Sequence, residues 1–508
     1  MISSTRTVAL IASLALLAAA GPLPTASAQV PIDFEGDEIL VNTYTSARQS
    51  GAEVAADAAG DFIVVWSDPF QDGSTSSVFG RRYTSAGAPR GGELAVNTYT
   101  TGTQFSASVA AGPAGDFLVV WASDADPDRF GVFARRYDGA GNPDGPEFQI
   151  NEYTTGSQTR PDIAALDGGG FVVAWSSDGQ DGSLDGIVAR RFDSVGSALG
   201  DEIVVNEYTT LLQSRPAVAS LADGGFVVSW GSLNQDGDSS GVFARRFDAG
   251  GAPASTEFQV NVFTTGSQSL PDVAGLPLGG FVIVWSSDEQ DGEDRGVFAR
   301  RYASDAAPIT GEIAVNTYTT ADQSEPAVSV SGDGDVLVVW QDVGGEEIPG
   351  QDGSAAGLFG RRFRPAGAAA GDEFQVNSFT TSSQYGPAVA PRGADGFVAS
   401  WSSDGQDGSF AGIIARRMIV PIDTTTTTTQ SSTTSTTAEP GACSAPLSGG
   451  PLPVVTDCLV VLRVAIGLDS CNPQCSCAPS GVLPVNTTDA LICIQAAVGQ
   501  DVQLSCPC

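Results

Sequence analysis

The stretch from Phe171 to Phe192 reads FVVAWSSDGQDGSLDGIVARRF. It opens with an apolar run that ends at Trp175, continues through an acidic, glycine-rich segment, and closes with a second apolar run that carries Arg190 and Arg191. Short apolar runs bounded by Asp and Gly are typical of buried β-strands joined by a turn. The stretch therefore predicts two paired strands and the hairpin between them.

Near copies of this stretch occur seven times in the 508 residues of the chain. Each of the seven tryptophans ends the first apolar run of one copy, and successive tryptophans are 54 to 61 residues apart. An Asn and an Arg pair keep the same interval, and a fixed period of this kind indicates a repeat architecture. The tryptophans are Trp66, Trp121, Trp175, Trp230, Trp285, Trp340 and Trp401, and the Arg pairs begin at Arg81, Arg135, Arg190, Arg245, Arg300, Arg361 and Arg416.

Each repeat contains four short β-like runs. In the fourth repeat they span residues 216–221, 226–230, 242–247 and 257–261, with turns rich in Asp, Gly, Pro and Ala between them. No window shows the apolar period of a helix. The pattern predicts an all-β fold, a seven-bladed β-propeller of four-stranded blades. A β-helix and a linear β-solenoid are the alternatives, although β-helix coils are shorter than this period and neither end of the array carries an evident cap.

The phase of the repeats predicts how the ring closes. The array starts with a lone strand of the fourth type at residues 38–42 and stops after a strand of the third type at residues 412–418. The first strand can complete the last blade and thereby remove two open sheet edges.

The repeated Trp and Arg residues have structural roles in this prediction. Each Trp is expected to wedge between blades. The two members of each Arg pair point in opposite directions, because side chains alternate along a strand. Inter-blade ion pairs or carbonyl contacts are the expected role of these arginines, and an anion-binding ring is the alternative.

Two families of loops are predicted to share one face of the propeller, because alternate loops of a meander emerge at the same end. One family joins the second and third strands and carries the acidic turn; the other opens each repeat with Asn-x-Tyr/Phe-Thr. If the propeller binds a glycan or protein, this is the expected face. Its aromatic residues either stack on sugar rings or seal the blade tops; they are Tyr44, Tyr99, Tyr153, Tyr208, Phe263, Tyr318 and Phe379.

The acidic turns admit two interpretations. Asp-Gly is a favoured hairpin turn on its own. Clusters of Asp oxygens also suit calcium, and calcium is the cofactor that the chain could hold. The candidate metal ligands are Asp178, Asp181 and Asp185 in the third repeat and Asp288, Asp291 and Asp294 in the fifth.

The residue types that are missing restrict the chemistry. The chain has no His, and all 24 of its basic residues are Arg. Catalytic triads with His, HExxH zinc sites, Lys Schiff bases and Walker-type phosphate loops are therefore excluded. The two-carboxylate mechanism of glycoside hydrolysis remains. The acids of the turns recur in nearly every repeat, so they single out no catalytic residue.

The formal net charge of −35 makes nucleic acid an improbable partner, because phosphate binding requires clustered basic residues. Residues 1–28 read as a secretory signal peptide, with Arg6, an apolar run and an Ala-Ser-Ala site, and an uncleaved anchor is the alternative. The mature chain is expected to be extracellular or attached to a cell surface, without a membrane span. It divides into the repeat array at 29–422, a Thr-rich linker at 423–440 and a Cys-rich segment at 441–508.

All eight cysteines lie in this last segment. An even count in a short secreted module predicts disulfides, and zinc is the alternative. The cysteines are Cys443, Cys458, Cys471, Cys475, Cys477, Cys493, Cys506 and Cys508.

Two families resemble parts of the chain. Units such as GGFVVAWSSDGQDGS, GVFARRFD and EFQVN resemble secreted bacterial repeat proteins of the β-propeller type. The Cys-rich segment contains a duplicated pattern, Thr456 to Gly467 and Thr488 to Gly499, that is similar to a type I dockerin, although the acidic ligands of the dockerin loops are absent. This resemblance implies two short helices and a cohesin-like or cell-surface protein as partner.

These features together suggest a secreted, non-catalytic binding or adhesion propeller, attached through a dockerin-like module. An extracellular polysaccharide-degrading enzyme of the glycoside hydrolase type, or its accessory subunit, is the alternative.

Overall fold

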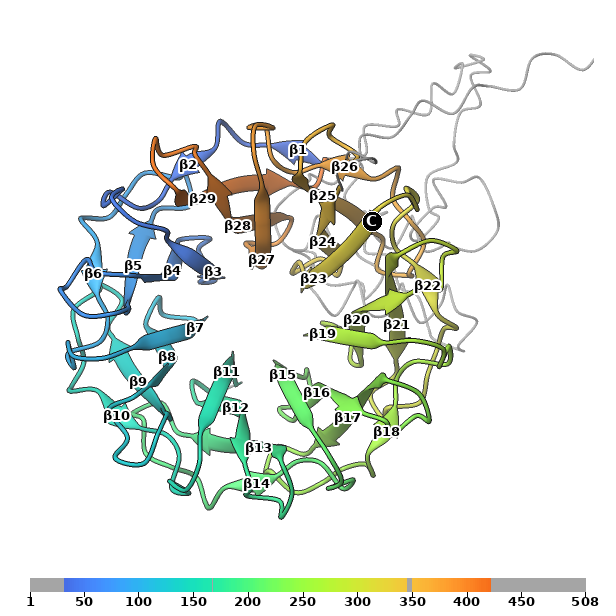
Figure 1. The fold of residues 1–508 in the computed structure, drawn as a ribbon, viewed down its shortest axis with the longest axis horizontal. Helices are drawn as coiled ribbons and strands as arrows, with labels where there is room; N and C mark the ends of the chain where they lie inside the picture. Colours follow the sequence, from blue (N-terminus) through green and yellow to red (C-terminus); the bar gives the residue numbers. More distant parts are fainter. Residues whose placement is uncertain (1–31, 167, 345–349, 422–508) are drawn as a thin grey trace, which may run out of the picture. The chain divides into compact units, whose positions relative to one another are not determined.

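The computed structural model of the chain describes residues 32–166, 168–344 and 350–421. Their regular elements are 29 strands in seven sheets around one axis, which form a seven-bladed β-propeller (Figure 1). The predicted all-β fold and its four-stranded blades are confirmed. The predicted signal peptide, Thr-rich linker and Cys-rich dockerin-like segment lie outside the described residues. Within the described ranges, no helix has the length and apolarity to cross a membrane.

Within each blade, the strands follow one another outward from the axis, and each strand is antiparallel to the next. The innermost strands of blades one to seven are β3 (Ser50–Ala56), β7 (Gln104–Ala111), β11 (Gln158–Ala165), β15 (Gln213–Ser220), β19 (Gln268–Gly275), β23 (Asp322–Val330) and β27 (Gln384–Arg392). The second strands are β4 (Phe62–Asp68), β8 (Phe117–Ser123), β12 (Phe171–Asp178), β16 (Phe226–Leu233), β20 (Phe281–Asp288), β24 (Val336–Val343) and β28 (Gly396–Asp404).

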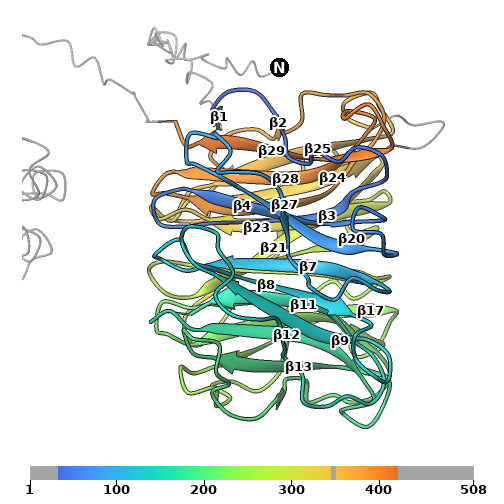
Figure 2. The same ribbon diagram turned by 90° about the vertical axis from the view of Figure 1, so that its left-hand side faces the viewer.

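The outer half of each blade consists of a long third strand and a very short fourth strand. The third strands are β5 (Ser77–Tyr83), β9 (Gly131–Tyr137), β13 (Asp185–Phe192), β17 (Ser240–Phe247), β21 (Arg295–Tyr302), β25 (Ala356–Phe363) and β29 (Ala411–Ile419). The fourth strands of the first six blades are β6 (Leu94–Ala95), β10 (Phe148–Gln149), β14 (Ile203–Val204), β18 (Phe258–Gln259), β22 (Ile313–Ala314) and β26 (Phe374–Gln375). Viewed from the side, the strands run between two loop-bearing faces (Figure 2).

The ring closes as the phase of the repeats predicts. The N-terminal strand β2 (Ile39–Leu40) pairs with β29, with Ile39 opposite Ala415, and so supplies the missing fourth strand of blade seven. A further strand, β1 (Asp33–Phe34), also pairs with β29 and was not expected from the sequence. The two ends of the array therefore share one sheet, which leaves no blade with a missing outer strand.

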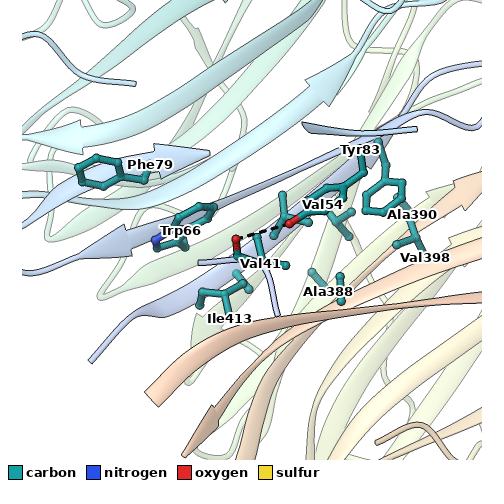
Figure 3. Packing of buried hydrophobic residues seen from close by; sticks show 13 residues of the cluster. Val41, Val54, Trp66, Phe79, Tyr83, Ala388, Ala390, Val398 and Ile413 are labelled. Atoms are coloured by element: carbon teal, nitrogen blue, oxygen red, sulfur yellow. Dashed lines mark hydrogen bonds between the residues drawn. The ribbon is translucent and has the colours of Figure 1, made fainter. Parts of the chain in front are cut away.

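Seven apolar clusters fill the seams between neighbouring blades, and each contains one of the seven tryptophans. Trp66 of blade one belongs to the same cluster as Ala388, Val398 and Ile413 of blade seven (Figure 3). All seven tryptophans are buried, which confirms their predicted place between blades. Successive side chains of a strand point to opposite faces of its sheet. Because neighbouring blades cover both faces, every residue of the strand must be apolar, which explains the unbroken FVVAW runs.

The paired arginines also join neighbouring blades. The first Arg of each pair donates to a backbone carbonyl of the preceding blade, as Arg245 does to Val205 at 2.9 Å. The second Arg points the other way, as Arg191 does to the carbonyl of Gly250 in the next blade at 2.6 Å. The predicted carbonyl contacts are confirmed. Some of these arginines add an ion pair within their own blade, such as the one between Arg362 and Asp335 of blade six at 2.8 Å, in which the Arg362 side chain is buried.

Candidate functional site

The two predicted loop families do lie together at one end of the blades. In four places, the Asn of the Asn-x-Tyr/Phe segment donates directly to the Asp of an acidic turn, as Asn206 does to Asp181 at 2.7 Å. In a fifth, Gln149 donates both to the Asn, Asn151, and to the turn residue Asp126. This face is called the loop-rich face below. The innermost strands also begin at this face, because Gln213 at the start of β15 lies opposite Ser232 near the end of β16.

The repeated Asn is a structural clamp. The Asn206 side chain is buried; its Oδ1 accepts from the amide of Ile187 at 2.7 Å, and its Nδ2 donates to the carbonyl of Tyr208 and to Gln213. The same contacts recur around the ring, so this segment is held by its own repeat. The aromatic side chains that follow are half-buried, except for the exposed Tyr99; the others are Tyr44, Tyr153, Tyr208, Phe263, Tyr318 and Phe379. Sugar stacking by them stays a prediction.

The acidic turns use their carboxylates in part within the fold. Asp181 accepts from Asn206 and from the amide of Ser183, and Asp291 accepts from Asn316 at 3.0 Å. Asp178 and Asp185 lie opposite each other across β12 and β13.

In the fifth repeat, the position equivalent to Asp185 is Arg295, which lies opposite Asp288, and the backbone carbonyl of Asp294 accepts from the amide of Glu289. Within residues 32–166, 168–344 and 350–421, no group of three or more His, Cys, Asp or Glu residues has the arrangement of a metal site. Calcium binding by these turns therefore stays a prediction.

Each innermost strand contains a β-bulge just inside the loop-rich face. In β11, for example, the pairing with β12 skips from Thr159 to Asp162. The residue two places after the repeated Gln has a positive φ in every blade; these residues are Gly51, Ser106, Arg160, Arg215, Leu270, Glu325 and Gly386. Five of the seven are not Gly, although such a conformation costs an L-residue about 1 kcal/mol or more. Proline follows the bulge residue in five blades. Proline has no N–H to donate, and it is tolerated here because the strand pairing is interrupted at the bulge.

The bulges surround a cavity of about 470 Å³ on the propeller axis. All seven innermost strands contribute to its lining, and Arg160 and Arg215 are among the lining residues. A volume of this size lies in the range of small-ligand sites, roughly 300–1,000 Å³. A second cavity of about 330 Å³ occupies the other end of the innermost strands and is lined mostly by Ala and Val, so the polar chemistry is concentrated at the loop-rich end.

Three carboxylic acids line the first cavity. They occupy the position four places after the repeated Gln, which holds Glu53, Ser108, Asp162, Ala217, Asp272, Ala327 and Ala388 in blades one to seven. Acids thus stand in blades one, three and five only. The repeat is therefore broken at this ring of positions, and the axis acquires an asymmetric set of groups.

The two aspartates bind the free inner edge of the following blade. Asp162 accepts from the amide of Val218 in blade four at 2.7 Å and from the hydroxyl of Ser108 in blade two at 3.0 Å. Asp272 accepts from the amide of Val328 in blade six at 2.7 Å. Innermost strands have unpaired backbone donors, and these carboxylates satisfy some of them.

Glu53 is different, because no described residue donates a hydrogen bond to its carboxyl group. Burial among the blades raises the pKa of Glu53 well above its usual value, and the charges of Asp162 and Asp272 raise it further. Burial likewise raises the pKa of Asp272, to about 7, against the hydrogen bond from Val328. The pKa of Asp162 is raised by burial and held down by the Val218 amide and the Ser108 hydroxyl. All three side chains remain partly accessible from the cavity.

Sequence reasoning overlooked these acids because it looked for residues that recur. The acids of the turns recur and are engaged within the fold, whereas Glu53, Asp162 and Asp272 are departures from the repeat. Aligning the seven segments on the repeated Gln would have exposed them as the acidic members of an otherwise small-residue position.

Comparisons with known proteins find solved structures that are similar to this chain at low sequence identity. No family model matches the chain, and no curated protein matches its sequence. A solved structure of a Penicillium chrysogenum α-L-arabinanase is 13% identical, with 75% of this chain and 98% of that one covered and a TM-score of 0.44. An ulvan lyase of polysaccharide lyase family 25 is 9% identical, with 76% and 95% covered and a TM-score of 0.44. A Dyadobacter fermentans protein of unknown function is 11% identical, with 77% and 100% covered and the same TM-score of 0.44. What this chain does must be inferred from its own residues.

Proposed function

We propose that the chain is a carbohydrate-active enzyme of the glycoside hydrolase type, whose active site is the cavity at the loop-rich end of the propeller axis. The observation that carries the proposal is Glu53, a carboxyl group with a strongly raised pKa and no described hydrogen-bond donor, beside two aspartates that are hydrogen-bonded. The secreted binding propeller favoured by the repeat pattern becomes the competing function.

The reaction class follows from the groups available. Glycoside hydrolysis needs one carboxyl group that stays protonated and donates to the leaving oxygen, and a second that is charged and acts as base or nucleophile. Catalytic pairs are recognised by environments that separate their pKa values. The absence of His and Lys from the chain leaves carboxylates as its acid–base groups of suitable pKa.

Glu53 fits the proton donor. Burial and two neighbouring acids favour its neutral form, so it can hold a proton near neutral pH. Asp162 fits the charged partner, because an amide and a hydroxyl donate to its carboxylate and fix its orientation. Burial raises the pKa of Asp272 to about 7, and the charge of Asp272 adds to the effects that favour the protonated form of Glu53.

The test is release of reducing sugar by the full-length protein from a panel of neutral and acidic polysaccharides. Glu53→Gln should lower kcat/KM about 10²- to 10⁴-fold, the usual contribution of a general acid. Asp162→Asn should also lower it, since the amide cannot act as a base. The wild-type rate should fall as the pH rises past the pKa of Glu53, because the protonated form is the active one.

A matched control is Glu293→Gln, the same chemical change at an exposed turn position outside the cavity lining. It should leave the rate unchanged. Binding of a glycan without any release of sugar, or a Glu53→Gln rate equal to that of the wild type, would refute the hydrolase and support a non-catalytic binding propeller.

A further inference from the structure

Two arginines at the mouth of the axial cavity are not used by the fold. Arg160 and Arg215 are exposed side chains that line the cavity from neighbouring blades three and four. Neither guanidinium group makes a hydrogen bond or an ion pair with a described residue. An arginine in this cavity therefore retains its full set of donors for a ligand.

This freedom is unusual in so acidic a chain. The protein contains 59 acidic residues and 24 arginines, and the repeated Arg pairs make carbonyl contacts across the seams and, in some blades, ion pairs within the blade. Partners for a guanidinium group are abundant, yet the two cavity arginines come from neighbouring blades and are close enough for their charges to interact. Partial burial lowers the pKa of Arg215 first, and the charge of Arg160 lowers it second.

The backbone at these two positions is strained as well. Arg160 and Arg215 are the bulge residues of β11 and β15, with φ values of 52° and 57°. Blades one and seven have Gly at this position, the residue that adopts such angles without strain. Two bulky side chains held at strained positions, with like charges side by side, are a combination typical of a binding site.

The charge at the mouth is also polarised. Glu325 occupies the bulge position of blade six and is close enough to Arg215 for the two charges to interact. Leu270 of blade five separates them along the ring. The two arginines thus lie over blades three and four, on the same side as Asp162, and Asp185 of blade three is close enough to Arg160 for their charges to interact.

We infer that the cavity accepts an anionic carbohydrate, with a carboxylate or sulfate group of the sugar bound between Arg160 and Arg215. Carboxylate and sulfate groups each present two oxygens that can accept from the fork of guanidinium donors, and two forks can bind one group together or one group each. The inference rests on the proposed function in that it takes the cavity as the carbohydrate site. It deepens that function by naming the substrate class, a uronate-containing or sulfated polysaccharide.

Binding measured without turnover tests the inference separately from catalysis. The full-length Glu53→Gln variant is titrated calorimetrically with short oligouronates of galacturonate, glucuronate or mannuronate, with their methyl esters, and with sulfated galactan oligosaccharides. At least one anionic probe should bind, and more weakly as salt is added. If the uronate binds, its neutral methyl ester should bind at least about 10-fold more weakly, since a hydrogen bond to a charged group contributes that much or more. Which probe binds distinguishes a carboxylate from a sulfate.

The variants locate the anion. Arg160→Gln combined with Arg215→Gln should weaken binding of the anionic probe by about 10- to 100-fold. Arg129→Gln is the matched control, because Arg129 is an exposed arginine outside the cavity lining; binding should be unchanged. Absence of binding by every anionic probe, equal affinity for a uronate and its ester, or full binding by the double variant overturns the inference. Failure of the hydrolase proposal would instead appear as absent sugar release by the wild type.

Discussion

The seams between the blades and the cavity on the axis follow opposite rules of sequence. In the seams, every blade repeats the same residues: a buried Trp, an Arg that reaches a carbonyl of the preceding blade, and apolar strands covered on both faces. Around the cavity, the corresponding positions vary from blade to blade. The position four places after the repeated Gln holds Glu, Ser, Asp or Ala, and the bulge position two places after it holds Gly, Ser, Arg, Leu or Glu. The comparison teaches that conformity to the repeat marks the scaffold of this protein, whereas departure from it marks the candidate site.

The largest effect should come from breaking a seam. Trp285→Ala removes a fully buried side chain from the cluster between blades four and five. It should lower the free energy of unfolding by about 3–5 kcal/mol, because the seam cannot close over the lost volume. Chemical denaturation measures the loss.

Leu270→Ala is the control for that experiment, since Leu270 is a partly buried bulge residue of an innermost strand. Its effect should be within about 0.5 kcal/mol, because Ala and Leu are equally strained at a positive φ. Equal losses for the two variants would contradict the distinction between seam and cavity.

A smaller effect should follow from the pH dependence of a cavity acid. Burial raises the pKa of Asp272 to about 7, so the folded protein keeps a proton that the unfolded chain has already released. Between about pH 4 and pH 7, the folded state therefore binds more protons, and the contribution of Asp272 to stability falls as the pH rises. Asp272→Asn mimics the neutral acid and does not titrate.

The stability of Asp272→Asn relative to the wild type should therefore increase between pH 4 and pH 8. We expect about 1–2 kcal/mol rather than the full value of roughly 4 kcal/mol for a shift of this size, because water in the cavity screens the charge. Denaturation at both pH values measures the difference. Asp138→Asn serves as control: hydrogen bonds from Asn142 lower the pKa of Asp138, and its variant should show no such gain. A pH-independent difference for Asp272→Asn would indicate that its carboxyl group titrates normally.

The smallest effect is expected at the acidic turns of the loop-rich face. Asp181 and Asp291 each accept from a buried Asn of the scaffold, so these turns belong with the seams rather than with the cavity. Calcium should therefore add little stability through them, whereas a bound ion at 100 times its dissociation constant would add about 2.7 kcal/mol. Calorimetric titration of calcium into chelator-treated protein measures it. Heat that disappears in Asp181→Asn or Asp291→Asn would establish a calcium site in the turns.

The prediction of the fold succeeded where local chemistry recurs. Four apolar runs per repeat, the regular spacing of the tryptophans and the lone first strand were sufficient to predict seven four-stranded blades and the closure through β2. The bounds of the innermost strands were less accurate: the prediction began the fourth repeat at residue 216, but β15 starts at Gln213. The bulge at Arg215 explains the difference, since Arg and Pro interrupt the β pattern while the strand continues on both sides.

The candidate site could not be predicted in the same way, because its members are far apart in the sequence and individually unremarkable. Glu53 and Asp272 are separated by four blade lengths of chain, and each belongs to a short polar segment of the kind usually found in loops. Only ring closure brings them to one axis, where the charge of Asp272 adds to burial in raising the pKa of Glu53.

The scaffold of this protein can be read from local sequence patterns: a period of about 55 residues, four strands in each period, and a Trp and an Arg pair in every repeat. The physical reason is that strand pattern, turn chemistry and apolar runs act locally and are repeated seven times. The closed ring sets which residues meet at the axis. Among the described residues, it also sets which cavity carboxyl group lacks a hydrogen-bond donor and which cavity arginines make no hydrogen bond or ion pair. These properties depend on the distances and burial that only the closed ring creates.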